Sequence, residues 1–406
     1  MIDFKNLYKQ QDFLLYLNEF YPDFEPKKEE LQINKKFKFI KSVIKLGKSK
    51  KLDVNVYEIE HVSENDPRVT LSKEAFSILR EYIARKSLVI FKNENTQNYR
   101  LSLITFQSTW ESGNKITTEF SNPRRYSFFL GPDAKVKTPT RFLIDKGKII
   151  DFEDLKNRFS LEVVNKEFYK DISEQFIKLV GGSLSKGKKK IEYQPLLKLP
   201  SISEKSQKSV EFAVRLIGRV IFCWFLREKK SLNRKSLVPK GLLSYEAIEG
   251  NSDYYHKILE PIFFEILNKQ IKTRREEFSN ELFSSIPYLN GGLFSPQDDD
   301  FYKRNSSDFQ SQYHNTLIIP DKWFSEFFEV LETYNFTIDE NTSFDEELSI
   351  DPEMLGRIFE NLLAEINPET GESARKSTGS YYTPRVIVDY MVDESLLLYI
   401  KEQTKI

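Results

Sequence analysis

Two adjacent tyrosines combine residue types and a spacing that could bind a ligand. Tyr381 and Tyr382 stand in the segment Gly-Ser-Tyr-Tyr-Thr-Pro, and an apolar run over 386–400 follows the proline. We expect this run to form a helix, whose first backbone amides can bind an anion such as a carboxylate. Paired rings in front of such a terminus could close over a flat or charged ligand. Ordinary packing of two aromatic rings in a loop explains the same pattern equally well.

Arginines at helical spacing form a second group that could act on a ligand. Arg215, Arg219 and Arg227 lie in one apolar segment, where residues four apart share a face of a helix. Such a face could contact phosphate, or its guanidinium groups could pair with acids on neighbouring helices. Charge runs are more often of the second kind. A further pair, Arg124 and Arg125, lies among aromatic residues.

The composition is that of a globular chain without a dominant charge. Apolar residues make up 39% and charged residues 30% of the 406 positions, and the formal net charge is zero. Contact with an acidic partner must therefore depend on local patches. The length suffices for two or three domains with their own cores. Phe and Tyr number 33 and 20 and Gly only 15, which argues against several glycine-rich nucleotide loops.

The sequence contains no pattern for a disulfide framework, a zinc site or a membrane span. Cys223 is the single cysteine, and the three histidines are scattered along the chain. The first residues carry acids and aromatics, unlike a signal peptide. No uncharged apolar run approaches the ~20 residues that cross a bilayer. We therefore expect a cytoplasmic location and no membrane partner.

Hydrophobic periodicity predicts the elements that must position these residues. In order along the chain, they are a strand hairpin over 36–62, a helix over 68–86, two strands over 87–107, and helices over 151–180 and 209–366. The four strands and one helix over about 36–110 form a compact α/β module. The Gly/Ser/Lys-rich segment 181–190 is expected to be a mobile basic loop, and a solvated connection is its simplest interpretation.

Four segments in a fixed order resemble a known enzyme family. These segments read IGRVIFCWFLREK, YLNGGLF, DPEMLGRIFENLL and TGSYYTPRVIVDYMV. The series is similar to the amino-terminal half of large adenine-specific DNA methyltransferases of restriction and phage-defence systems. Eco57I-like fused restriction–modification enzymes and BREX-type methyltransferases are members. The resemblance covers roughly 120–400, and the shared order makes it specific, whereas any one segment would be weak.

The resemblance implies an α+β fold in three parts. These are a small nuclease-like α/β module over 1–150, a mostly helical connector over 151–366, and the start of an adenine-N6 methyltransferase domain over 367–406. The implied role is the front portion of a type IIG-like enzyme that positions double-stranded DNA. Arg124, Arg125, Arg215 and Arg219 would be its DNA-binding positions.

The Gly-Ser-Tyr-Tyr-Thr-Pro turn is, in that family, the first element of the methyltransferase domain. It lies against bound S-adenosylmethionine. The resemblance therefore implies that one edge of the cofactor site is formed by Thr378, Gly379, Ser380, Tyr381, Tyr382, Thr383 and Pro384.

The sequence also departs from the family. No glycine follows Gly379 to form a cofactor loop, and no Asn-Pro-Pro-Tyr tetrapeptide is present to hold a flipped adenine. The region that would read the DNA sequence is missing as well. We therefore expect the chain alone not to transfer methyl groups. The missing part would follow in the same chain or come as a second chain, which would make this protein a DNA-binding or docking subunit of a split enzyme.

Members of the family often carry a PD-(D/E)xK nuclease, and the module over 1–150 has the strand order for one. Such a site needs acids that hold Mg²⁺ and a lysine two residues after the glutamate. Asp53, Glu58 and Glu60 lie on the second strand of the hairpin, but Glu60 occupies the place of the lysine. Lys73 on the following helix could substitute for it. A module that has lost catalysis, or that only holds DNA, fits this spacing better than an active magnesium-dependent endonuclease.

Overall fold

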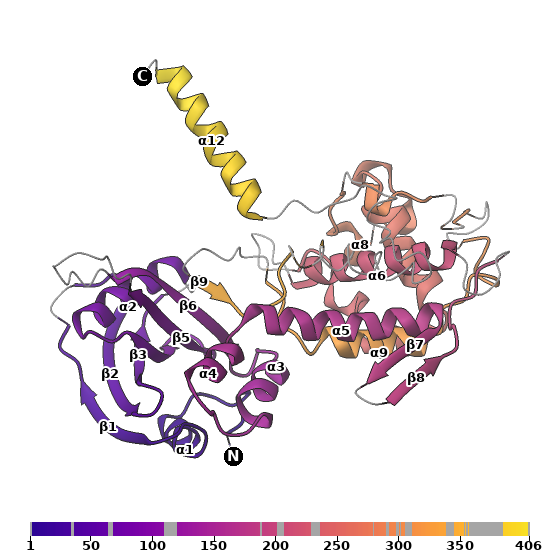
Figure 1. Ribbon diagram of the computed structural model, residues 1–406. Coiled ribbons are helices and arrows are strands. Elements are labelled where there is room, and N and C mark those ends of the chain that lie inside the picture. The colour runs from indigo at the N-terminus through magenta and orange to yellow at the C-terminus, as the bar shows by residue number, and fades with distance from the viewer. Residues whose placement is uncertain are drawn as a thin grey trace. The chain divides into compact units, whose positions relative to one another are not determined.

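The computed structural model (Figure 1) divides the chain into two compact units. Unit 1 consists of Met1–Phe168 and Val330–Ile350, and unit 2 of Tyr169–Glu329 and Asp351–Ile406. The residues described by the structure are 2–33, 36–63, 68–108, 120–186, 189–200, 207–228, 236–278, 280–289, 292–297, 300, 302–304, 311–337, 345–352, 354, 356 and 385–404.

Unit 1 is built on a mixed sheet, which confirms the α+β class. Within the described residues the sheet has seven strands, in the order β1-β2-β3-β4-β5-β6-β9. Their bounds are Phe24–Glu30, Ile40–Ser49, Val54–His61, Lys86–Asn93, Tyr99–Ser108, Phe120–Leu130 and Asp345–Glu347. Neighbouring strands are antiparallel except β3 with β4 and β6 with β9. β3 and β4 are parallel because the helix α2 (Arg68–Glu81) returns the chain across the sheet between them.

Different helices cover the two faces of this sheet. α2 packs an apolar stripe with Leu71 and Ala75 against Ile59 and Phe91 on one face. The helix α1 (Gln10–Phe20) packs on the other face, where the ring of Phe13 lies 5.6 Å from that of Tyr99 on β5. With both faces covered, the central strands β3 and β4 are largely buried, and β4 carries the continuous apolar run Leu-Val-Ile-Phe over 88–91.

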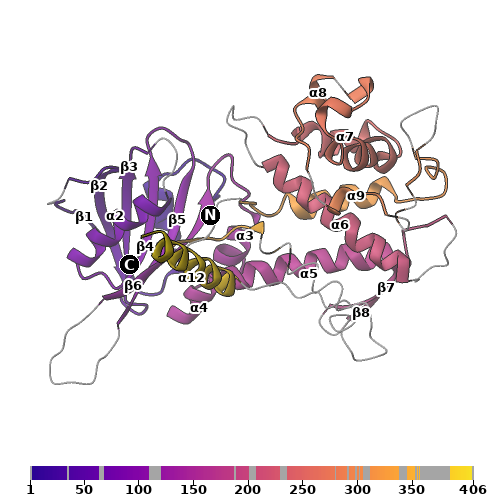
Figure 2. The same ribbon diagram turned by 90° about the horizontal axis from the view of Figure 1, so that it is seen from above.

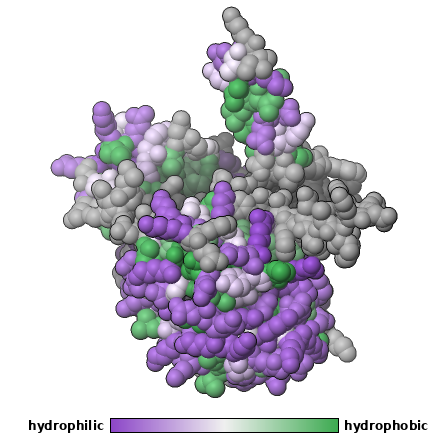
Figure 3. Space-filling view, turned by 90° about the vertical axis from the view of Figure 1, so that its left-hand side faces the viewer, coloured by the Kyte–Doolittle hydropathy of each residue, from purple (hydrophilic) through white to green (hydrophobic). Residues whose placement is uncertain are grey.

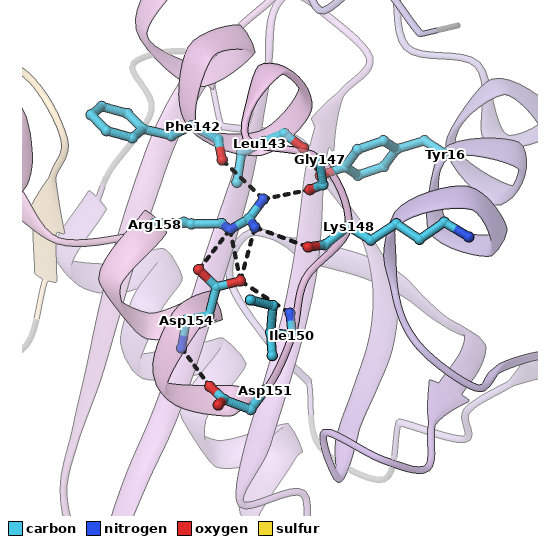
Figure 4. A network of polar contacts seen from close by, with 9 residues as sticks. All are labelled: Tyr16, Phe142, Leu143, Gly147, Lys148, Ile150, Asp151, Asp154 and Arg158. Atoms are coloured by element: carbon cyan, nitrogen blue, oxygen red, sulfur yellow. Dashed lines mark hydrogen bonds and ion pairs between the residues drawn. The ribbon is translucent and has the colours of Figure 1, made fainter.

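A buried arginine fastens the helix α4 (Phe152–Arg158) to the segment before it (Figure 4). The guanidinium of Arg158 donates to the carboxylate of Asp154 and to the carbonyls of Phe142, Gly147 and Lys148. Asp154 also accepts from the amide of Ile150. Burial alone would raise the pKa of Asp154, but the bond from Arg158 lowers it overall. This cluster holds the irregular chain around the short helices α3 (Lys137–Thr140) and η1 (Arg141–Asp145).

Unit 2 is mostly helical. Its longer helices are α5 (Leu161–Val180), α6 (Gln207–Glu228), α9 (Asp321–Leu331) and α12 (Arg385–Thr404), of which α5 begins and α9 ends in unit 1. Shorter ones are η2 (Lys240–Leu242), α7 (Tyr245–Glu249), η3 (Tyr255–Leu259), η4 (Pro261–Leu267), η5 (Ile271–Thr273), η6 (Glu276–Phe278), α8 (Glu281–Ser284) and η7 (Gly292–Phe294). Its core is aromatic: Trp224 lies 5.2 Å from Phe328, which lies 5.9 Å from Tyr254.

Segment 181–190 differs from the expected mobile loop. It contains β7 (Gly182–Lys186), which pairs with β8 (Lys189–Tyr193) in a separate antiparallel hairpin. Gly and Ser have low strand propensity, so the local sequence favours a loop. The base of the hairpin is fixed by contacts with α5, including a 3.0 Å hydrogen bond from the Tyr193 hydroxyl to Glu174.

The helix α12 exposes apolar side chains all around its circumference. Ten large hydrophobic residues between Ile387 and Ile400 are each 42–65% exposed. Figure 3 shows such side chains along the helix at its top, whereas the face of unit 1 turned to the viewer is mostly hydrophilic. None of the described helices, α12 included, is long and apolar enough to cross a membrane. A helix that is apolar on every side is normally buried among other elements.

Candidate functional site

The predicted acids Glu58 and Glu60 meet a lysine at one end of the sheet. Both point to the same face of the sheet, because they are two residues apart on β3. This is the face that α1 covers. Parallel pairing sets Lys92 of β4 directly beside Glu60. The Lys92 Nζ lies 2.8 Å from Glu60 Oε2 and 3.2 Å from Glu58 Oε1. The residues before and at the start of α1 complete the cluster: the Tyr8 hydroxyl and the Gln10 amide donate to Glu58 Oε2 at 2.5 and 2.7 Å.

Burial of Tyr8 and the carboxylates beside Lys92 keep these two donors of the cluster protonated. Burial on its own would lower the pKa of Lys92, but its hydrogen bonds with Glu60 and Glu58 raise it, so the amine stays protonated. Burial, and then the charge of Glu58, raise the pKa of the Tyr8 hydroxyl, which therefore remains a donor. At the rim, the hydrogen bond from Lys41 lowers the pKa of Glu94. The side chain of Glu58 is only 3% exposed.

The cluster has the residue types of a magnesium site but is saturated by its own donors. Mg²⁺ is bound by one or two carboxylates together with waters and substrate phosphates. Here one oxygen of Glu58 accepts from Tyr8 and Gln10, and the other faces Lys92. Within the described ranges no group of three or more Asp, Glu, His or Cys side chains is arranged to hold a metal ion. As it stands, the geometry fixes strands to each other and does not present ligands.

The other two predicted nuclease residues lie elsewhere. Asp53 is in the turn before β3 with φ +53°, and its carboxylate pairs with Lys48 at 2.6 Å. It is five residues before Glu58, about 16 Å away along a strand. Lys73 is an exposed residue of α2, which covers the opposite face of the sheet. The structure therefore brings neither of them to Glu58.

Lys92 is the residue that the sequence reasoning missed. It lies at the end of a correctly predicted strand. A helix between two strands indicates that they run parallel, and parallel neighbours place Lys92 next to Glu60. The signal was therefore present in the order of the elements and not in the local spacing of residues.

Arg215 and Arg219, two of the predicted DNA-binding residues, are both paired with one acid. The Arg215 Nε and Arg219 Nη2 lie 2.9 and 2.7 Å from the two carboxylate oxygens of Asp300, which is fully buried. Arg219 also donates to the carbonyl of Leu293 at 2.7 Å. One carboxylate thus engages both guanidinium groups inside unit 2, and a role of these arginines in binding DNA stays a prediction.

Arg125 is a buried structural residue as well, whereas Arg124 is exposed. Arg125 donates to Ser102 and Ser72 at 3.1 and 2.9 Å and lies 3.7 Å from the Asp345 carboxylate of β9. Alternation along β6 sends the neighbouring side chain of Arg124 to the other face. Of the four predicted DNA-binding arginines, Arg124 is exposed, Arg215 is partly buried, and the other two are buried.

The predicted cofactor turn lies outside the described residues, so its geometry remains an expectation. This applies to Thr378, Gly379, Ser380, Tyr381, Tyr382, Thr383 and Pro384. The helix expected after the turn is present as α12, which begins at Arg385 directly after the proline.

Comparison with known proteins finds a similarity over part of the chain. The chain is 31% identical over 265 residues to a Methanocaldococcus jannaschii protein named "Putative type II restriction enzyme and methyltransferase". The match covers 60% of this chain and 20% of that protein, so the chain spans about a fifth of the length of this relative. No family model matches the chain, and no solved structure does. The chain is therefore similar, over part of its length, to a protein whose name combines restriction with methyl transfer.

Proposed function

We propose that the chain is the DNA-positioning front portion of an adenine-N6 DNA methyltransferase of the type IIG-like restriction–modification class. In this proposal the segment 378–384 forms one edge of the S-adenosylmethionine site. The relative from Methanocaldococcus jannaschii supports the proposal, since its name combines restriction with methyl transfer. Double-stranded DNA is the substrate, and the catalytic and target-recognition parts lie in further polypeptide.

The exposed apolar surface of α12 is the observation that carries the proposal. The helix directly follows the Tyr381–Tyr382 turn, and residues such as Leu396, Leu397 and Tyr399 are at least half exposed. Burying one such side chain is worth roughly 1.5–3 kcal/mol, so ten of them favour association with more protein strongly. Apolar residues on all sides fit a helix enclosed within a domain. A methyltransferase domain that continues from the turn would enclose it.

The first experiment joins the chain to the polypeptide encoded directly after it and measures transfer of labelled methyl groups to duplex DNA. We expect N6-methyladenine from the joined protein and negligible incorporation from the 406-residue chain alone. Changing both Tyr381→Ala and Tyr382→Ala in the joined protein should weaken S-adenosylmethionine binding about tenfold, because ring contacts contribute up to about 1.5 kcal/mol. Methyl transfer by the chain alone, or methylation of another base, would contradict the proposal.

The cluster around Glu58 supports a module that does not cut DNA. Because both oxygens of Glu58 are engaged, Mg²⁺ can bind only if Lys92 and the donors before α1 move away. We therefore expect supercoiled plasmid to remain intact when incubated with the chain and Mg²⁺ or Mn²⁺, as judged by gel electrophoresis.

If the plasmid is cleaved, two variants show whether this cluster is responsible. Loss of the cleavage in Glu58→Gln, and its survival in the control Glu25→Gln, would assign an endonuclease to this cluster. Glu25 is an exposed residue of β1 that pairs with Lys50, so it provides the same change of charge on the same unit. Cleavage that survives both changes would indicate a contaminating nuclease.

A further inference from the structure

The hairpin of β7 and β8 carries basic residues at the start of its second strand. Figures 1 and 2 both show it projecting from the end of α5. Gly181 ends that helix with φ +78°, and a Cβ there would come within 2.9 Å of Pro195, so the sharp turn requires glycine. Backbone amides of Leu196 and Leu197 then bond to the carbonyl of Leu179 at 3.1 and 3.0 Å. The hairpin therefore has a fixed base on unit 2.

The two faces of the hairpin differ. Leu184 pairs with Ile191 on one face, and both are half-buried, as is Tyr193 farther along the same face. Ser185 and Lys190 pair on the other face and are exposed. The apolar face anchors the hairpin to unit 2, and the polar face is turned to solvent.

Lysines are concentrated in the sequence where the first strand of the hairpin ends and the second begins. The sequence Ser-Lys-Gly-Lys-Lys-Lys occupies 185–190, and no acid occurs between Glu174 and Glu192. Register sets Lys186 directly opposite Lys189. A hairpin of two strands is only marginally stable by itself. Lys189 and Lys190 have no ion-pair partner among the described residues. The fold therefore does not explain these lysines.

We propose that Lys189 and Lys190 of this hairpin contact the phosphate backbone of double-stranded DNA. The inference rests on the proposed function, which makes DNA the substrate. A two-stranded ribbon is narrow enough to enter the major groove, and phosphates on its rim are within reach of lysines. The net charge of the chain is zero, so no global field attracts DNA. With Arg125, Arg215 and Arg219 paired inside their units, these two lysines provide a local positive patch.

Fluorescence anisotropy with a labelled duplex tests this contact. The variant is Lys189→Gln with Lys190→Gln in the full chain. The control is Lys170→Gln with Lys272→Gln, two exposed lysines of unit 2 whose removal changes the net charge equally. Binding constants are measured over a series of NaCl concentrations. Each lost phosphate contact reduces the slope of log K against log salt by about 0.9, so the hairpin variant should lose about 1.8 and the control much less.

The outcomes separate this inference from the proposed function. Equal salt slopes for the hairpin and control variants would overturn the hairpin contact, while methyl transfer by the joined protein would still support the function. A reduced slope for the hairpin variant alone, without methyl transfer by the joined protein, would support the contact and contradict the function. Absence of measurable duplex binding at low salt, or weaker binding of the hairpin variant to anionic lipid vesicles alone, would also overturn the contact. Unchanged circular dichroism and melting show that the variants are folded.

Discussion

The substitution Asp300→Asn should lower the free energy of unfolding by about 3 to 5 kcal/mol, the usual cost of breaking a buried ion pair from one side. Asn keeps the size of the side chain and removes its charge. Two guanidinium groups of α6, on Arg215 and Arg219, then lose the carboxylate that now lies 2.9 and 2.7 Å away. Arg219 is 1% exposed, so water cannot replace the lost partner.

Urea unfolding followed by tryptophan fluorescence measures this loss. Trp224 lies on α6 and reports on the helix that carries both arginines. The control is Glu162→Gln, which breaks an exposed pair with Lys166 on α5 and should cost about 0.5 kcal/mol or less. If the arginines served phosphate instead of Asp300, the Asp300→Asn variant would bind DNA more tightly at little cost in stability. That combination would support the DNA-binding interpretation.

The second large effect is expected for Arg125→Gln, again about 3 to 5 kcal/mol of unfolding free energy. The residue is fully buried, and its guanidinium lies 4.1 Å from the centre of the Phe91 ring. Its loss leaves Asp345 as a buried acid without this cation and removes the bonds to Ser72 and Ser102. Because the carboxylate of Asp345 is costly to bury without its cation, we expect β9 to detach from β6.

The neighbouring residue provides a matched control for this prediction. Arg124→Gln makes the same chemical change one position earlier, on an exposed side chain, and should alter stability by no more than about 0.5 kcal/mol. Thermal melting by circular dichroism compares the two variants, and hydrogen exchange locates the loss at β6 and β9. Equal melting temperatures would mean that Arg125 is not part of the core.

Periodicity predicted the central elements of unit 1 because burial dominates there. The alternation in β3 and the helical spacing in α2 reflect packing that local sequence records. Local sequence also explains the bond at Asp351, an acid that accepts from the amide of Met354 three residues later at 3.0 Å, as N-cap residues do. The predicted three-part division of the chain stays a prediction.

The strands β1 and β9 could not be predicted in the same way. β1 contains several charged residues and Pro26, a composition that suits only an edge strand. β9 reads Asp-Glu-Glu, which no strand propensity favours. Its acids lie in the sheet because Arg125 and Arg100 meet them there, the latter at 3.3 Å from Glu347. Such pairing depends on tertiary contacts between distant segments.

For the candidate site, residue types were easier to predict than their neighbours. Glu58 and Glu60 lie on one face of the sheet and pair with the same lysine, but this lysine comes from β4 and not from α2. The pairing of arginines with acids was the more common alternative in sequence terms, and it is what α6 shows. Spacing along one helix cannot reveal which acid a distant loop supplies.

The link between β6 and β9 has a consequence for synthesis on the ribosome. Arg125 and Asp345 are 220 residues apart in the chain, so the arginine emerges long before its partner. At 5 to 20 residues per second, the interval is roughly 10 to 40 s. During that time the outer edge of β6 has no strand beside it, and a nascent sheet with an open edge is a target for chaperones or for premature pairing. The late addition of three acidic residues then closes the sheet.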